Sequence, residues 1–217
     1  MSDNQREAGT IILDPTHASF APEETVHDLG ATHFIGIGGA GMSVLAEMLH
    51  EQGVEVDGSD REPSAKTDRL QSLGITVEFG QQAKNVEGKN PVVFSSAIKP
   101  DNPEIVAAHE AGERIVHRSD ILALLMNAKR AVTVAGAHGK TTTTSMITTA
   151  LELAGRDPSA VIGGKLPLIH GYGKAGKGDD IVIEACEFSE TFLKLTPYLS
   201  VVLNIDNDHL DYYGSMG

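Results

Sequence analysis

A lysine and four threonines follow two glycines in the stretch GAHGKTTTT, residues 136–144. Gly136 and Gly139 allow positive φ angles and close approach of the backbone, so successive N–H groups can point at one anion. Lys140 adds a compact positive charge for the outer oxygens of a phosphate chain, and the Thr141 hydroxyl is a ligand for a Mg²⁺ ion that bridges the phosphates. The spacing predicts a site for a nucleoside triphosphate.

This loop is a variant of the usual pattern G-x-x-x-x-G-K-[ST], because Val134 occupies the position of the first glycine. A short GK[ST] also arises by chance, and the alternative is a helix capped by a glycine turn with an exposed lysine. The flanking sequence favours the nucleotide interpretation. Residues 131–135 are apolar and β-prone, and apolar residues recur at helical spacing from Met146 to Ala154.

An earlier glycine pattern, G-x-G-x-x-G at Gly36, Gly38 and Gly41, begins within a predicted strand over residues 32–37. A helical segment comes next, and then a strand-like stretch that contains Asp57 and ends in Asp60. This order predicts a doubly wound nucleotide-binding unit, with a diphosphate at the helix N-terminus and Asp60 or Asp57 bound to a ribose or base. A nicotinamide or flavin cofactor is the first candidate, but a dehydrogenase does not need the second phosphate loop.

Helices and strands alternate along the rest of the chain. A helix is expected over 64–73 and strands over 75–79 and 92–94, with Ser96 and Ala97 at the carboxyl end of the latter. The sequence thus predicts an α/β protein with three parts. These are an N-terminal tail at 1–31, a Rossmann-like domain at 32–128, and a partial P-loop ATPase-type central domain at 129–217.

Two acidic stretches end predicted strands of the central domain. Residues 181–183 lead into Glu184, and residues 200–205 lead into a segment that contains His209. An acid at the end of a strand beside a phosphate loop completes Mg²⁺ coordination, and Glu184 is assigned that role. The alternative is that these acids are solvated and His209 caps a turn. Residues 166–180 have the composition of a loop, and Gly163-Gly164 is expected to mark a turn.

Composition limits the partners. The formal charge of −13 argues against nucleic acid or an anionic membrane, which clustered Lys and Arg would bind. The single cysteine, Cys186, excludes an internal disulfide and fits a reducing compartment. No basic-then-apolar leader opens the chain, and no stretch approaches the roughly 18 apolar residues of a membrane span. A soluble cytoplasmic protein is expected.

The motifs HFIGIGGAGMS, SSAI, AGAHGKTTTT, Glu184 with Cys186-Glu187, and NIDNDHLDYY together resemble the Mur ligases of peptidoglycan synthesis. The resemblance runs from about residue 32 to the end and is greatest to members that join L-alanine to UDP-N-acetylmuramic acid. It implies that the first domain binds the UDP-sugar and that the central domain binds ATP with Mg²⁺. The lactyl carboxylate would attack the γ-phosphate, and L-alanine would then displace phosphate from the acyl phosphate.

The resemblance also implies site residues. Lys140, Glu184 and His209 would be catalytic, and Thr141, Glu184 and His209 would bind metal. The ATP-binding residues would be Gly136, Ala137, His138, Gly139, Lys140, Thr141 and Thr142, and the UDP-sugar-binding residues Gly38, Gly39, Ala40, Gly41, Met42, Asp60, Ser96 and Ala97. The chain departs from the family pattern at Ala137, usually threonine, at Gln81, often histidine, and at Cys186, often aspartate.

The family pattern continues beyond Gly217, through the remaining ATPase sheet and a third domain. We therefore expect that the 217-residue chain does not ligate alanine by itself, and that an unpaired sheet edge promotes self-association. Three alternatives stay open. They are a recycling ligase that attaches a preformed peptide to the same UDP-sugar, a nicotinamide-dependent oxidoreductase, and a non-catalytic UDP-sugar-binding module.

Overall fold

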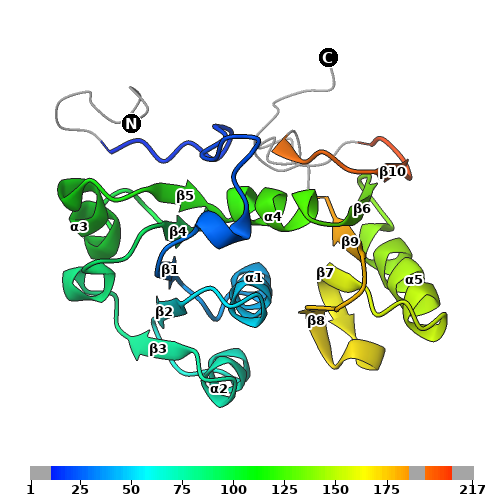
Figure 1. The fold of residues 1–217 in the computed structure, drawn as a ribbon, viewed down its shortest axis with the longest axis horizontal. Helices are drawn as coiled ribbons and strands as arrows, with labels where there is room; N and C mark the ends of the chain where they lie inside the picture. Colours follow the sequence, from blue (N-terminus) through cyan, green and yellow to red (C-terminus); the bar gives the residue numbers. More distant parts are fainter. Residues whose placement is uncertain (1–10, 186–193, 207–217) are drawn as a thin grey trace. The chain divides into compact units, whose positions relative to one another are not determined.

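The computed structural model describes residues 11–185 and 194–206, which form two compact units (Figure 1). The first unit comprises Met1–Ser19 and His27–Arg118, and the second comprises Phe20–Val26 and Ser119–Gly217. This division falls at the start of helix α4 (Arg118–Asn127), whereas the sequence analysis placed the domain boundary at the end of that segment.

The first unit has a five-stranded parallel sheet of order β3-β2-β1-β4-β5. Its strands are β1 (Thr32–Ile35), β2 (Val56–Asp60), β3 (Thr76–Phe79), β4 (Val92–Phe94) and β5 (Ile115–His117). Its helices are α1 (Ala40–Glu51), α2 (Ala65–Ser72), α3 (Pro103–Ala111) and the 3₁₀ turn η3 (Ala83–Val86), and a further 3₁₀ turn, η2 (Val26–Asp28), lies at the division between the units. The strand order reverses between β1 and β4, which is where doubly wound sheets bind ligands. The predicted Rossmann-like fold is confirmed.

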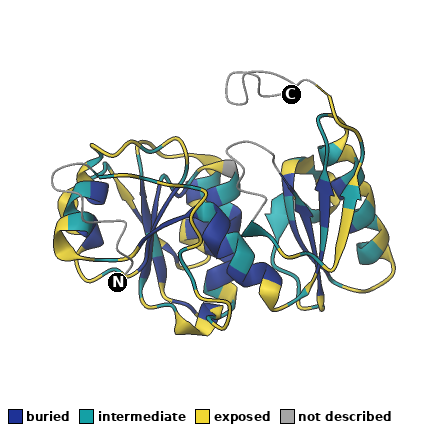
Figure 2. Cartoon of the chain, turned by 90° about the horizontal axis from the view of Figure 1, so that it is seen from above, coloured by how far each residue is buried: buried dark blue, intermediate teal, exposed yellow. Residues whose placement is uncertain are grey.

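Burial follows this topology. Strands β1, β4 and β5 are buried at every residue, while the edge strand β3 is largely exposed. Figure 2 shows the buried strands at the centre of each unit and exposed residues on the helices and loops around them. A cluster that includes Ile35, Phe94 and Ile105 fills one side of the first sheet, and Ile11 and Leu13 of the predicted tail pack against it.

Local sequence sets the helix ends. The Ser64 hydroxyl accepts a hydrogen bond from Thr67 N, while Thr67 Oγ1 accepts one from Ser64 N, so a capping box begins α2. The Asn102 side chain accepts from Glu104 N, and Pro103 occupies the first turn of α3. Pro and Asn at these positions therefore set the start of α3.

The second unit has a five-stranded sheet of order β10-β6-β9-β7-β8. All its neighbouring strands are parallel except β7 and β8, which pair antiparallel. The strands are β6 (Arg130–Ala135), β7 (Ser159–Leu166), β8 (Gly171–Lys174), β9 (Asp180–Glu184) and β10 (Leu199–Val202), and the helices are α4, α5 (Lys140–Leu153) and the 3₁₀ turn η4 (Pro167–Ile169).

Two predictions for this unit were wrong. Residues 166–180 are not all loop, since they complete β7 and contain β8, and Gly163 and Gly164 lie inside β7 instead of in a turn. A Cβ at Gly163 would lie 2.8 Å from both Glu184 oxygens, and one at Gly164 would lie 2.8 Å from Thr141 Cγ2. These glycines make room for neighbouring side chains, a requirement that the sequence alone does not reveal.

The buried face of α5 also differs from the apolar one expected. Thr144 and Thr148 are fully buried, whereas Met146 is 67% exposed and Leu153 77% exposed.

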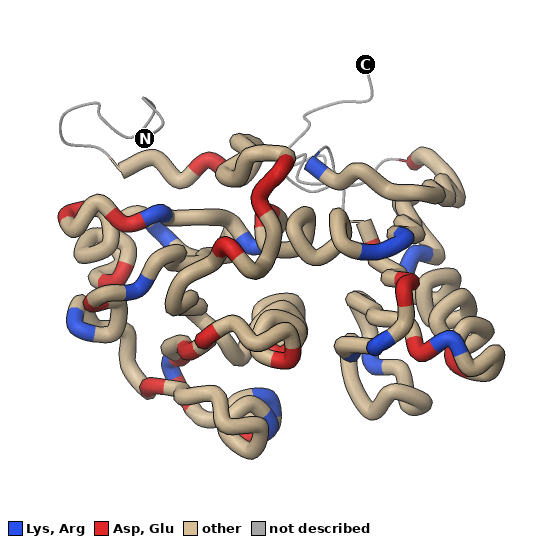
Figure 3. The backbone as a smooth tube through the Cα atoms, viewed as in Figure 1, with Lys and Arg blue, Asp and Glu red and all other residues tan. Residues whose placement is uncertain are grey.

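Acidic and basic residues are interspersed over the elements of both units (Figure 3). None of the helices within residues 11–185 and 194–206 combines the length and apolar character needed to cross a bilayer.

Candidate functional site

The loop between β6 and α5 holds the predicted triphosphate residues. Gly136 has a φ of 138°, and a Cβ there would lie 3.1 Å from Asn204 N and O. Gly139 has a φ of 88° and forms the N-cap of α5, whose first turn has neither a side-chain cap nor an acidic residue. The first amides of α5 and its dipole are therefore available to an anion. Both glycines adopt the positive φ that the sequence predicts.

Lys140 folds back over this loop. Its Nζ donates hydrogen bonds to Gly136 O and, at 3.3 Å, to Ala137 O. The ammonium group is thus held by two main-chain carbonyls of the loop that precedes α5. His138 and Gly139 in the same loop are exposed, as is Thr142 one turn further on.

Glu184 lies beside Thr141. It is the last residue of β9, and β9 pairs directly with β6, with Glu184 opposite Val134. The Thr141 hydroxyl lies 2.9 Å from Glu184 Oε2 and 3.1 Å from Oε1, and Gly163 N donates to Oε2 at 2.8 Å. The structure therefore brings together a hydroxyl and a carboxylate that the sequence analysis assigned to one metal.

Asn204 contacts the phosphate loop, which was not predicted from the sequence. Its Oδ1 accepts a 2.9 Å hydrogen bond from His138 N, and its Nδ2 donates a 2.8 Å bond to His138 O. The segment after β10 thereby fixes the exposed part of the phosphate loop. The available signal was an amide side chain just beyond a strand that borders the loop strand.

Three residues named in the sequence analysis, Cys186, Glu187 and His209, lie outside the described residues. Within residues 11–185 and 194–206, no group of three or more His, Cys, Asp or Glu side chains could hold a metal ion. Thr141 and Glu184 are thus the part of the predicted metal site that the structure describes.

The first glycine loop is tied to the end of β2. Gly36 N and Ile37 N donate to Ser59 O at 2.8 and 2.9 Å. Gly38 N donates to Asp60 Oδ2 at 2.7 Å, and a Cβ at Gly38 would lie 2.8 Å from that oxygen. Asp60 therefore holds the loop in place, a role that leaves carboxylate lone pairs for a ligand.

Helix α1 begins at this loop with an open N-terminus. Its N-cap, Gly39, has no side-chain cap, and no acidic residue lies in its first turn. Ala40 and Gly41 supply its first backbone amides, whereas Met42, also predicted to bind the UDP-sugar, is only 3% exposed. These amides lie at the carboxyl edge of β1, beside the point where the strand order reverses.

Arg118 is a second residue that sequence analysis missed. It follows β5 directly, and a Cβ on Gly41 would overlap its Nη1 atom, so the guanidinium lies against the N-terminus of α1. Among the described residues, Arg118 makes no hydrogen bond or ion pair. The half-buried guanidinium of Arg118 thus lies beside the open N-terminus of α1. Both are positive, so together they favour binding of an anion at this position.

Ser96 and Ala97 follow β4 and are exposed, as their predicted role requires. Ser96 Oγ lies 3.1 Å from His117 Nε2, and the His117 ring stacks edge-on against Phe94 with centroids 5.2 Å apart. The loop after β1, the last residue of β2 and the loop after β4 therefore each place predicted UDP-sugar residues at one edge of the first sheet.

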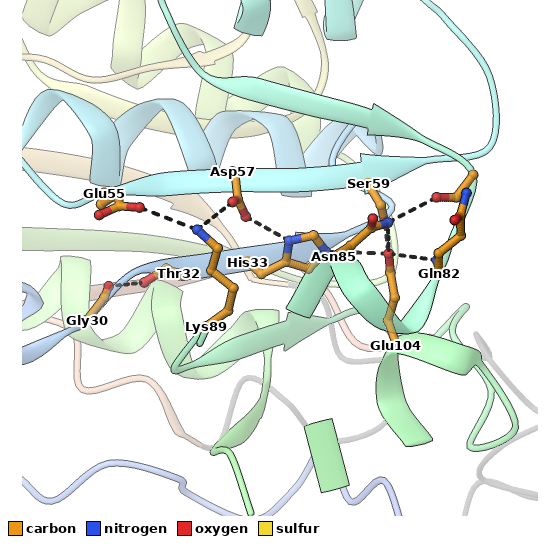
Figure 4. A network of polar contacts seen from close by, with 11 residues as sticks. Gly30, Thr32, His33, Glu55, Asp57, Ser59, Gln82, Asn85, Lys89 and Glu104 are labelled. Carbon is orange, nitrogen blue, oxygen red and sulfur yellow. Dashed lines mark hydrogen bonds and ion pairs between the residues drawn. The ribbon is translucent and has the colours of Figure 1, made fainter. Parts of the chain in front are cut away.

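A buried polar network lies beneath this edge (Figure 4). His33 Nδ1 lies 2.7 Å from Asp57 Oδ1, and Lys89 Nζ lies 2.7 Å from Asp57 Oδ2. His33 Nε2 lies 3.7 Å from Glu104 Oε1, a distance for an ion pair but too long for a hydrogen bond. His33 and Glu104 are almost fully buried.

The pKa values in this network favour the charged forms. Burial lowers the pKa of His33, but its contacts with Asp57 and Glu104 outweigh burial and raise this pKa above its usual value. Burial raises the pKa values of Asp57 and Glu104, but their contacts with His33, together with Lys89 for Asp57 and Ser59 for Glu104, lower both pKa values overall. These directions favour an imidazolium at His33 between two carboxylates.

This network predicts a pH-dependent stability. The contribution of His33 is full below its unfolded pKa of about 6.5 and is lost as pH rises through its raised folded pKa. The contributions of Asp57 and Glu104 are full above about pH 4.3 and are lost as pH falls through their lowered pKa values. The difference in Tm between the wild type and His33→Asn should therefore be largest near pH 5–6.

Thermal unfolding of both proteins from pH 5 to 9 checks this expectation. Near pH 5–6 the substitution should lower the free energy of unfolding by about 3–5 kcal/mol, the usual effect of breaking a buried ion pair. The difference in stability between the wild type and His33→Asn should become smaller toward pH 9. A difference that does not vary with pH would contradict the charged state of His33.

The fold and the two loops define a class of nucleotide-binding α/β proteins, with a Rossmann-like unit followed by a unit with a P-loop variant. The chain belongs to the Mur ligase family. Residues 31–130 match the sequence profile described as "Mur ligase family, catalytic domain", and residues 134–217 match the "Mur ligase middle domain".

Individual relatives agree. The chain is 78% identical to a UDP-N-acetylmuramate–L-alanine ligase of Bifidobacterium adolescentis over 99% of its length, and 50% identical to one of Sorangium cellulosum over 84%. It spans 43% and 39% of these proteins, respectively, which is under half of either.

Solved structures show the same fold. The crystal structure of UDP-N-acetylmuramate-alanine ligase from Thermotoga maritima is 34% identical with a TM-score of 0.78, over 85% of this chain and 44% of that one. The UDP-N-acetylmuramate:L-alanyl-gamma-D-glutamyl-meso-diaminopimelate ligase from Neisseria meningitides is 29% identical with a TM-score of 0.77, over 85% and 63%.

Proposed function

We propose that this chain binds UDP-N-acetylmuramic acid in residues 32–128 and Mg-ATP in residues 129–217. The whole protein of which these are a part would join L-alanine to the lactyl carboxylate of the sugar. The observation that carries this proposal is the pair of Thr141 and Glu184, at 2.9 Å, beside Lys140 and the open N-terminus of α5. That arrangement suits a nucleoside triphosphate with its metal, in a family of ligases.

The reaction has two steps. A lactyl carboxylate oxygen bonds to the γ-phosphorus while the bond from that phosphorus to ADP breaks, giving an acyl phosphate. The amino nitrogen of L-alanine then bonds to the acyl carbon, inorganic phosphate leaves, and the amine loses a proton. The carboxylate and the triphosphate repel each other by about 4 kcal/mol at 4 Å in a partly desolvated site, so cations must offset this charge.

The residues of this chain fit those demands. Lys140 would exchange its bonds to Gly136 O and Ala137 O for phosphate oxygens. The Thr141 hydroxyl and the Glu184 carboxylate are both oxygen donors, which Mg²⁺ prefers, and the ion would supply charge neutralisation at the phosphates. His209 as a ligand of a second metal stays a prediction, because it lies outside the described residues.

In the first unit, the amides at Gly39–Met42 and the Arg118 guanidinium would hold the diphosphate. Asp60 at the end of β2, and Ser96 and Ala97 after β4, lie at the same carboxyl edge of the sheet and would contact the rest of the ligand. Arg118 makes no hydrogen bond or ion pair among the described residues, so its guanidinium is available to the diphosphate.

Separate titrations with UDP-N-acetylmuramic acid and NADH test the proposal against the oxidoreductase alternative. We expect saturable binding of the UDP-sugar and no measurable binding of NADH. The control is UDP-N-acetylglucosamine, which lacks the lactyl carboxylate but keeps the diphosphate. Tight NADH binding without UDP-sugar binding would refute the assignment.

The acceptor is proposed from the relatives. The 78% identity to an L-alanine ligase favours L-alanine over a preformed peptide.

Self-association also stays a prediction. Leu199 and Val202 on the edge strand β10 are 52% and 64% exposed, and sedimentation velocity in the micromolar range would reveal an oligomer.

A further inference from the structure

One buried carboxylate joins three segments of the first unit (Figure 4). Glu104, fully buried in the first turn of α3, accepts a 2.7 Å hydrogen bond from Ser59 Oγ and a 2.6 Å bond from Asn85 Nδ2. Gln82 N donates to the same carboxylate at 3.4 Å. Glu104 therefore connects the end of β2, the loop after β3, and α3.

The end of β2 holds Asp60, a residue of the proposed UDP-sugar site, and two loops are attached to it. Ser59 O accepts the bonds from Gly36 N and Ile37 N that fix the glycine loop. Gly80 N donates to Asp60 O at 2.8 Å, so the loop after β3 is attached to the predicted ligand residue Asp60. The contacts of Glu104 thus converge on the backbone that places the ligand-binding residues.

The loop after β3 depends on side chains for its position. Asn85 Nδ2 donates to Gly80 O at 3.0 Å as well as to Glu104, and Asn102 Nδ2 donates to Gln81 Oε1 at 2.7 Å. No regular hydrogen-bonded ladder crosses this loop, since β3 ends at Phe79 and η3 begins at Ala83. Loss of the Glu104 contacts would leave the loop without its buried anchor.

Charged groups on neighbouring elements keep Glu104 ionised. His33 on β1 faces it at 3.7 Å, Asp57 on β2 holds the other side of the His33 ring, and Lys89 pairs with Asp57 and, at 3.3 Å, with Glu55. A carboxylate accepts several hydrogen bonds and donates none, which matches the three donors around Glu104. A neutral amide at this position would present an NH₂ group to at least one of those donors.

We propose that Glu104 is a positioning residue for sugar-nucleotide binding, which sets the conformation of the loop Gly80–Gln82 relative to the glycine loop. This inference rests on the proposed function of the first unit. Glu104 itself does not touch the ligand, since it is fully buried beneath these loops. The loop it orders contributes Gln82, an exposed amide side chain at the sheet edge.

The test compares four variants of the 217-residue chain: Glu104→Gln, Asn85→Ala, the double variant of these two, and Glu110→Gln. Glu104→Gln keeps the side-chain shape and removes the charge, and Asn85→Ala cuts the tie to the loop without removing the partner of His33. Glu110→Gln, exposed on the same helix, is the matched control. Affinity for UDP-N-acetylmuramic acid and for Mg-ATP is measured by calorimetry at 10 °C, with circular dichroism to establish that each variant is folded.

We expect Glu104→Gln to weaken UDP-sugar binding at least tenfold and Asn85→Ala to weaken it about three- to tenfold, with Mg-ATP affinity unchanged in both. The two effects should not add in the double variant, because both act through the same contact. Glu110→Gln should bind like the wild type. Wild-type affinity for the UDP-sugar in folded Glu104→Gln and Asn85→Ala would overturn the proposal. If Glu104→Gln does not fold, wild-type affinity in Asn85→Ala is enough to overturn it.

Amide hydrogen exchange separates this inference from the proposed function. Exchange at Gly80 and Gln82 should accelerate in Glu104→Gln and Asn85→Ala but not in Glu110→Gln, without any ligand present. If the wild type fails to bind the UDP-sugar while exchange accelerates as expected, the proposed function fails and the role of Glu104 in ordering the loop stands. Unchanged exchange in the folded variants would refute that role.

Discussion

Replacing Lys140 with alanine is expected to weaken Mg-ATP binding by about 100-fold, equivalent to about 2.7 kcal/mol. The substitution removes the only side-chain cation that the described part of the phosphate loop presents, and the triphosphate then depends on backbone amides and the metal alone. Binding of UDP-N-acetylmuramic acid should not change, because its proposed residues lie in the other unit.

Calorimetric titration of the variant with ATP, in the presence and absence of Mg²⁺, measures this effect. Lys165→Ala is the matched control, since Lys165 is an exposed lysine of the same unit, on β7. An unchanged Mg-ATP affinity in Lys140→Ala would show that the loop is only a helix cap, which is the alternative that the sequence left open.

The second large effect concerns Arg118. Replacing it with alanine should weaken binding of UDP-N-acetylmuramic acid and of UDP by about 10- to 100-fold, since a hydrogen bond to a charged group contributes about 1.5–3 kcal/mol. The guanidinium lies against Gly41 at the open N-terminus of α1 and has no partner among the described residues, so its loss should leave the folded state intact.

Uridine provides the control for this variant because it lacks the diphosphate. Its affinity, measured by competition or by NMR titration, should be the same in the wild type and in Arg118→Ala. Arg114→Ala, an exposed arginine just before β5, should leave all three affinities unchanged. An equal loss for uridine and UDP would contradict a role for Arg118 at the phosphates.

The parts of the site that the sequence predicted are those set by local pattern. A glycine in a loop motif indicates a positive φ angle, and Gly36, Gly136 and Gly139 all have one. The loop motifs also indicate where each helix begins. The pairing of Thr141 with Glu184 was also predictable, because parallel strands that end in functional residues meet at one edge of a sheet, and β9 lies next to β6.

The missed parts depend on contacts between distant segments. Arg118 and Asn204 are ordinary polar residues until the fold places them beside Gly41 and His138. Gly163 was interpreted as a turn because the sequence does not show that its missing side chain makes room for Glu184. Likewise, the exposure of Met146 depends on which face of α5 the sheet covers. No local period encodes such information.

The two units are proposed to bind two different nucleotides, each at its own site. The most direct test is a sequential calorimetric titration of the 217-residue chain, first with UDP-N-acetylmuramic acid and then with Mg-ATP, repeated on Arg118→Ala and Lys140→Ala. We predict one site for each ligand in the wild type, with Arg118→Ala impairing only the first and Lys140→Ala only the second. Competition of the two ligands for one site, or loss of both in either folded variant, would contradict the claim.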